Sequence, residues 1–212
     1  MKVWDPRVTE PIVTMDPSST DVDCWSACFG NAFNDTDRCV AAGYDNGDIK
    51  LLDLRTMTLR WEHCVMNGIC HLSFDRRDIS MNKLSAACLE AQLHVFDMRT
   101  FNIKRGFCGL SETIGKSTVW GCHYLPQDRE IFATTSGDGS LSLYKYEYPM
   151  ERSMKDDEGL DVGMAGTLRL LGKNDNISTQ PLIAFDWNPD KKGLGITASV
   201  DQCLRSIITT SL

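Results

Sequence analysis

The stretch Gly109–Ser117 has two glycines and ends in Gly-Lys-Ser, residue types that can hold nucleotide phosphates. A phosphate-binding loop has one residue fewer between its glycines. It is also followed by a helix, whose first amide N–H groups face the phosphate. Here Thr118–Tyr124 follows the motif and has the composition of a strand. We therefore do not predict nucleotide binding from it.

Cysteine and histidine could bind a metal, and the chain has nine cysteines and four histidines. Cys24 and Cys28 would share one face of an extended strand. A zinc site there would need histidines from distant parts of the chain, whereas structural zinc ligands usually come in close pairs. The cysteine count is odd and no C-x-x-C pair occurs. We predict nine small buried thiols, no disulfide framework, no metal and no cofactor.

An enzyme would need ionisable side chains that converge on one point. Asp186, His71 and His123 are the candidates for such a site. The acidic run at 156–158 is predicted to be a solvated loop, because an acid/base pair needs a buried carboxyl group. We predict no catalytic residues and a non-catalytic protein, and keep an enzyme built on these three residues as an alternative.

Composition limits the remaining classes. With 212 residues the chain can form one domain with a real core. Its net charge of -7 argues against nucleic-acid binding, which requires clustered basic residues. No apolar run is long enough to cross a bilayer, and the N-terminus lacks the apolar segment of a signal peptide. We predict a cytoplasmic protein that binds neither nucleic acid nor membrane.

A strand–turn–strand unit recurs along the chain and would position these residues. It is clearest at Ala42–Arg55, where Asn46-Gly47 is a strong hairpin turn and alternating apolar residues follow. The closing strands of the units end at Asp5, Asp53, Asp97, Lys145 and Ile208. The spacings are 48, 44, 48 and 63 residues, and a period in the forties is typical of β-propeller blades.

A second anchor repeats in step with the first. Four strands end on an aromatic residue, namely Phe29, Phe74, Tyr124 and Trp187. We predict an all-β, partial β-propeller of about four blades, with one leading strand at Val3–Asp5. The predicted units are residues 11–56, 59–100, 102–149 and 167–212. An acidic, glycine-bearing surface loop at 151–166 accounts for the longest spacing.

These units resemble WD repeats. The resemblance rests on Val3-Trp4-Asp5, on the unit ending in Leu51-Leu52-Asp53, and on Val119-Trp120 leading to Tyr124. No Gly-His dipeptide precedes the aromatic-ended strands, so the hydrogen-bond network of model WD repeats is incomplete here. The chain more specifically resembles the Monad family of WD-repeat dynein axonemal assembly factors. The matching segments are 42–51, 74–84, 94–100, 116–120, 146–149 and 178–181.

The resemblance implies a seven-bladed propeller, of which this chain would form the last four repeats and one strand. It implies a cytoplasmic co-chaperone that works beside a complex of prefoldin-like and AAA-ATPase subunits. The implied task is the pre-assembly of axonemal dynein heavy chains for motile cilia. Two other uses of a propeller remain open, a peptide reader or adaptor of the chromatin or ubiquitin type and a propeller enzyme.

The family pattern also implies which loops share a face. The tight turns and the long connection at 109–117 would lie on one rim, with the 151–166 insertion on the other. We predict that proteins bind one of these two rims. The predicted partner-binding residues are Asp45, Asn46, Glu90, Lys116, Asp138 and Asp201.

Overall fold

The computed structural model describes residues 1–76, 78–156, 159–210 and 212. In these residues the helix and strand assignment consists of β-strands alone, as predicted for an all-β chain. No helix in the described part is long and apolar enough to cross a membrane. The strands form small antiparallel sheets that follow one another along the chain, which confirms the partial β-propeller.

Four sheets are the blades, here called A to D, and a strand pair precedes them. The pair is β1 (Lys2–Val3) and β2 (Val13–Thr14). Blade A is β3 (Cys24–Gly30), β4 (Cys39–Tyr44), β5 (Asp48–Asp53) and β6 (Thr58–Cys64). Blade B is β7 (Ile69–Phe74), β8 (Lys83–Cys88), β9 (Gln92–Asn102) and β10 (Gly106–Thr113).

Blade C is β11 (Val119–Leu125), β12 (Asp128–Ser136), β13 (Leu141–Glu147) and β16 (Thr167–Asn174). Blade D has three strands, β17 (Leu182–Trp187), β18 (Leu194–Ser199) and β19 (Leu204–Ile208). The strand that opens each predicted unit pairs with the preceding sheet, as β6 does with β5 and β10 with β9. The sequence unit and the blade are therefore offset by one strand.

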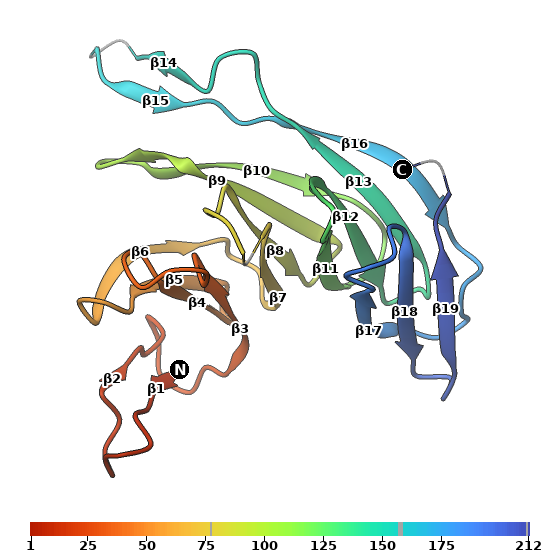
Figure 1. Cartoon of the computed structure of the whole chain (residues 1–212), viewed down its shortest axis with the longest axis horizontal. Helices are drawn as coiled ribbons and strands as arrows, with labels where there is room; N and C mark the ends of the chain where they lie inside the picture. Colours follow the sequence, from red (N-terminus) through yellow and green to blue (C-terminus); the bar gives the residue numbers. More distant parts are fainter. Residues whose placement is uncertain (77, 157–158, 211) are drawn as a thin grey trace.

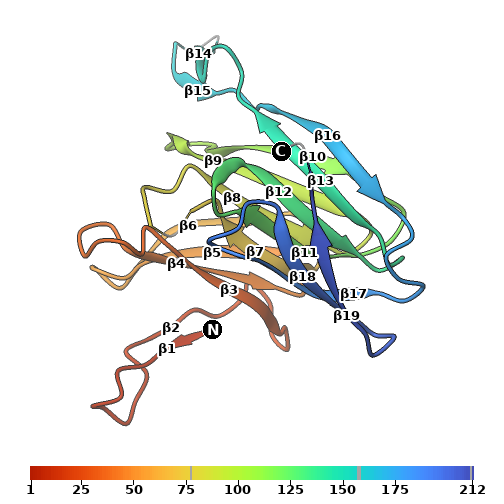
Figure 2. The same cartoon turned by 45° about the vertical axis from the view of Figure 1, so that its right-hand side comes forward.

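The blades fan around an open arc, with the first strands β3, β7, β11 and β17 toward its inside (Figures 1 and 2). Apolar side chains fill the space between neighbouring sheets, so the core is divided among the junctions. One cluster joins blades A and B, a second joins B and C, and a third joins C and D. The rigidity of the arc therefore depends on each junction separately.

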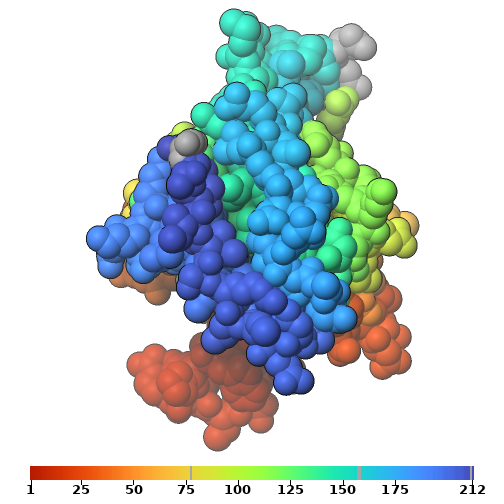
Figure 3. All heavy atoms as spheres, turned by 90° about the vertical axis from the view of Figure 1, so that its right-hand side faces the viewer, coloured from red at the N-terminus to blue at the C-terminus, as the bar shows by residue number. Residues whose placement is uncertain are grey.

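The insertion at 151–166 differs from the predicted loop. It contains a hairpin of β14 (Ser153–Lys155) and β15 (Asp161–Gly163), while residues 157 and 158 of the predicted acidic run lie outside the described residues. Asn102 Nδ2 donates a hydrogen bond of 2.8 Å to the backbone oxygen of Asp161. The hairpin thus leaves blade C and rests on blade B, and it projects from one end of the molecule in Figure 3.

Two further expectations were wrong. Cys24, Cys64 and Cys203 are exposed, so the cysteines are not all core thiols. The connection predicted at 109–117 is shorter, because β10 runs to Thr113 and its pairing with β9 continues through Gln92. Only residues 114–118 then remain as the connection into blade C.

Candidate functional site

The predicted rim exists as a continuous track of loops. It alternates between the tight turn inside each blade and the link that enters the next blade. Successive loops are joined by backbone N–H to carbonyl bonds of 2.9–3.2 Å. The bonds run from Val65 to Gly47, Leu89 to Gly68, Ile114 to Ala91, Gly137 to Thr118, Ser178 to Gly139 and Val200 to Pro181. This pairing satisfies loop backbone groups and fixes the turns of all four blades relative to one another.

All six predicted rim residues lie on this track. Asp45, Glu90, Lys116 and Asp138 are exposed, whereas Asn46 and Asp201 are half-buried. The six residues come from four blades and follow the track from one blade to the next. They do not form one compact cluster, so the arrangement suits a partner that lies along the rim.

Asn46 stabilises its own turn. Its amide nitrogen donates to Asp48 Oδ2 at 2.9 Å and to the hydroxyls of Ser18 and Ser19 at 3.2 Å. Burial raises the pKa of the Asp48 carboxyl group, but hydrogen bonds from Ser18 and Asn46 outweigh burial and lower it. Asn46 and Asp48 together connect the turn of blade A to the link that precedes the blade.

Asp138 and Asp201 also hold their turns. Asp138 Oδ1 accepts hydrogen bonds from the backbone N and the hydroxyl of Ser140, at 3.0 and 2.6 Å. Asp201 pairs with Arg205 and accepts a hydrogen bond of 3.0 Å from the Ser178 hydroxyl. The Arg205 guanidinium holds the pKa of the Asp201 carboxyl group well below its usual range.

Asp45, Glu90 and Lys116 differ from those three. Among the described residues, no hydrogen bond or ion pair involves their side chains, so they are available to a partner. Glu90 also lies in an unusual turn, because Glu90 and Ala91 have φ values of 55° and 61°. The matching second position is Gly47 in blade A and Gly139 in blade C, where positive φ is easily adopted.

Met66 is a rim residue that the sequence analysis missed. It lies in the link between blades A and B, is 87% exposed, and has a φ of 61°. Its backbone lies against Gly47, where an added Cβ would come within 2.9 Å of the Met66 nitrogen. No periodicity in the sequence marks it, since it belongs to a short connection between strands.

The candidate enzyme residues do come together on the inner strands. The rings of His71 and His123 are 4.6 Å apart between centroids, and both line a cavity of about 280 Å³ with Asp186 and Cys28. The backbone N of Cys122 donates to His71 Nδ1 at 3.4 Å. Among the described residues, no three His, Cys, Asp or Glu side chains are arranged to hold a metal ion.

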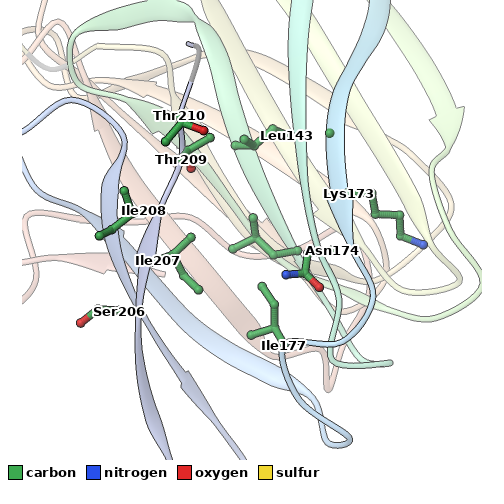
Figure 4. Close-up of a pocket in the computed structure, with 11 residues that line it drawn as sticks. Leu143, Lys173, Asn174, Ile177, Ser206, Ile207, Ile208, Thr209 and Thr210 are labelled. Atoms are coloured by element: carbon green, nitrogen blue, oxygen red, sulfur yellow. The ribbon is translucent and has the colours of Figure 1, made fainter.

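Larger cavities also flank the blades, and two of them are lined by residues of blade C. One of about 460 Å³ lies between blade C and β19, with Leu143, Ile177 and Ile207 on its walls (Figure 4). The other, of about 560 Å³, lies at the rim opposite the track. Its lining includes Asp75, Asp78, Asp186, Tyr124 and Trp187.

Sheet order and the loop track define the chain as a partial β-propeller with an ordered loop rim. No family model matches it. Crystal structures show the same fold at low identity. The computationally designed Ika4 protein gives a TM-score of 0.60 at 15% identity, over 92% of this chain and 96% of that one. A chain of an active polycomb repressive complex 2 in the basal state gives a TM-score of 0.66 at 12% identity, over 94% of this chain and 40% of that one.

Relatives by sequence are much closer. The chain is 55% identical to dynein axonemal assembly factor 10 of Bos taurus, 54% to that of Homo sapiens and 51% to that of Chlamydomonas reinhardtii. Each match covers 100% of this chain and 60% of the relative. The resemblance to the dynein axonemal assembly factors, predicted from the sequence, is confirmed over the whole of this chain. The chain spans about three fifths of the length of these relatives.

Proposed function

We propose that this chain is the partner-binding part of a dynein axonemal assembly factor, a non-catalytic scaffold that acts in the cytoplasm. The relatives' name supports the role in dynein assembly. Family resemblance supports the finer parts of the proposal: WD repeats in a seven-bladed ring, a co-chaperone beside prefoldin-like and AAA-ATPase subunits, and dynein heavy chains as the assembled cargo in ciliated cells.

The observation that favours a scaffold is the ordered rim. Its loops are joined by backbone hydrogen bonds, so the rim presents side chains in fixed positions without needing a catalytic group. Asp45, Glu90 and Lys116 have no partner side chain among the described residues, and Met66 adds an exposed apolar surface between the first two. We propose that partners contact this rim.

The test uses recombinant candidate partners, namely the chaperone-complex subunits and a dynein heavy-chain segment. Size-exclusion chromatography with light scattering and a thermal melt first establish that the chain is a folded monomer. Partner affinity is then measured for the wild type, for Glu90→Lys with Asp45→Lys, and for Lys116→Glu. Asp190→Lys is the matched control, because Asp190 is exposed on the opposite rim.

We expect the rim reversals to weaken binding and Asp190→Lys to leave it unchanged, because charge reversal acts on the contact surface alone. Equal binding by all variants would exclude this rim. Loss of binding only in Asp190→Lys would place the partner on the opposite rim.

A second candidate function is a peptide reader or adaptor. It is favoured by the cavity of about 560 Å³ opposite the track, whose lining includes Tyr124, Trp187 and the exposed Asp186. Aromatic faces and carboxylates together suit a basic side chain. A peptide array that includes histone tails, read with wild type and Asp186→Asn, distinguishes this function from the scaffold. Binding that depends on Asp186 would support the reader.

A further inference from the structure

The chain contains two Asn-Gly pairs, and the fold places them together on the rim. They are Asn46-Gly47 in the turn of blade A and Asn67-Gly68 in the link to blade B. A Cβ added to Gly47 would lie 2.7 Å from the backbone N of Asn67. Asn-Gly is the dipeptide in which the backbone N of the second residue most easily attacks the asparagine side chain, because glycine has no side chain in the way.

Asn46 is held away from this reaction. Its Oδ1 accepts a hydrogen bond of 3.1 Å from the backbone N of Asp48, and its Nδ2 donates to Asp48, Ser18 and Ser19. The attacking atom is also engaged, since the Gly47 N–H donates to the Tyr44 carbonyl at 3.0 Å. Attack on Cγ requires that these bonds open first.

Asn67 has fewer restraints. Its Nδ2 donates one hydrogen bond of 3.0 Å to the Leu89 carbonyl. Among the described residues, none is formed by its Oδ1 or by the N–H of Gly68. Asn67 is half-buried and belongs to no strand, so water reaches its side chain. Gly68 is buried and its carbonyl accepts the Leu89 N–H, so attack by its nitrogen requires a local opening of this link.

We propose that Asn67 is a site of spontaneous deamidation in the folded protein and that the fold protects Asn46. The Gly68 nitrogen loses its proton to a solvent base and bonds to Asn67 Cγ. The Cγ–Nδ2 bond breaks and ammonia leaves, which gives a succinimide. Water then adds to either ring carbonyl and yields aspartate or isoaspartate. The step needs water alone as co-reactant.

The modification changes the rim where blades A and B meet. A carboxylate at position 67 cannot donate to the Leu89 carbonyl, so the side-chain bond between the link and the turn of blade B is lost. A new negative charge also appears beside Asp45 and Glu90. Isoaspartate lengthens the backbone next to Gly68, whose carbonyl accepts the Leu89 N–H. This inference does not depend on the proposed function.

The experiment incubates the purified chain at mildly alkaline pH and physiological temperature. Peptide mapping by mass spectrometry then follows conversion of each amide to an acid. We expect Asn67 to react on the order of tenfold faster than Asn46, since Asn46 must break several more hydrogen bonds. In concentrated urea both sites should react at similar rates, because the neighbouring residue is glycine in each case.

Ser18→Ala combined with Ser19→Ala is the matched variant. It removes hydrogen bonds from Asn46 and none from Asn67, so only Asn46 should accelerate. The proposal is overturned if folded Asn46 reacts as fast as Asn67. It is equally overturned if neither site reacts in the folded chain while both react in urea.

Discussion

The A–B and B–C junctions bury different chemistry. Between blades A and B the contact is almost wholly apolar, and Leu51, Leu84 and Ile69 are fully buried there. Between blades B and C an apolar cluster is accompanied by a buried group of charges. Lys83 and the carboxyl group of Asp75 have no solvent exposure, and they meet Arg129 and Glu130 of β12.

The charged group is closely connected. Arg129 Nε donates to Asp75 at 2.8 Å, and Lys83 Nζ donates to Glu130 at 3.1 Å and to the Tyr148 hydroxyl at 2.6 Å. Burial lowers the pKa of Lys83, although Asp75 and Glu130 oppose the change. A buried ionic group contributes little net stability, but removal of one member strongly destabilises the protein because it leaves an unpaired buried charge. The A–B junction therefore depends on apolar side chains that fill the space between the sheets, whereas the B–C junction also depends on which charged side chains are paired.

The largest expected effect is at Asp75. Asp75→Asn keeps the shape but leaves Lys83 and Arg129 with Glu130 as the remaining carboxylate, so the free energy of unfolding should fall by about 3–5 kcal/mol. Urea unfolding measures it. Asp78→Asn, in an exposed ion pair of the same loop, should cost about 1 kcal/mol or less. Equal costs for the two variants would contradict the special role of the buried charges at the B–C junction.

At the apolar junction, Leu51→Ala should lower the free energy of unfolding by about 3 kcal/mol, because it leaves a cavity among fully buried neighbours. Leu51→Met conserves volume and should cost about 1 kcal/mol. The same urea titration compares them. If methionine proved as costly as alanine, side-chain identity would matter at this junction as it does at the other.

His94 makes stability at the apolar side depend on pH. Burial lowers the pKa of its imidazole to about 4, and nearby His63 adds to the shift. An unfolded histidine has a pKa near 6.5. The neutral form is favoured on folding, so this stability is complete above about pH 6.5 and is lost as the pH falls toward about 4. The loss should be at most about 3 kcal/mol, because each unit of pKa difference corresponds to about 1.4 kcal/mol.

His94→Leu should remove that part of the pH dependence, as measured by thermal melts across the same range. The substitution breaks no hydrogen bond of Nε2 at neutral pH, because this atom of His94 has no partner among the described residues. A variant with the wild-type slope would assign the acid sensitivity to other groups.

The smallest expected effect concerns the tight turns of blades A and B. Ala91→Gly should raise the free energy of unfolding by about 1 kcal/mol, since position 91 has a φ of 61°. Gly47→Ala should do the reverse, because its φ is 90° and the added Cβ would meet the Asn67 nitrogen at 2.7 Å. Thermal melts of both variants test whether the backbone of the turn in blade B is more strained than that of the turn in blade A.

Strand positions could be predicted because they depend on local patterns. The strand predicted to end at Asp53 is β5, and Asn46-Gly47 lies in the tight turn before it, although only Gly47 of the two has a positive φ. The hairpin in the insertion could not be predicted, since its strands are three residues each and it rests on blade B, far away in sequence. The partner-binding role of the six rim residues stays a prediction.

The sequence by itself determined the all-β class, the repeat and the ends of β5, β7, β17 and β19. Alternating apolar residues and turn residues with positive φ act over a few neighbouring positions, so they can be recognised without the fold. The tertiary structure alone decided which charges meet. Lys83 and Glu130 are 47 residues apart, and their contact exists because blade C packs on blade B. Contacts between loops also decided how the two Asn-Gly pairs are restrained, because Ser18 and Ser19 accept hydrogen bonds from Asn46 and the Leu89 carbonyl accepts one from Asn67.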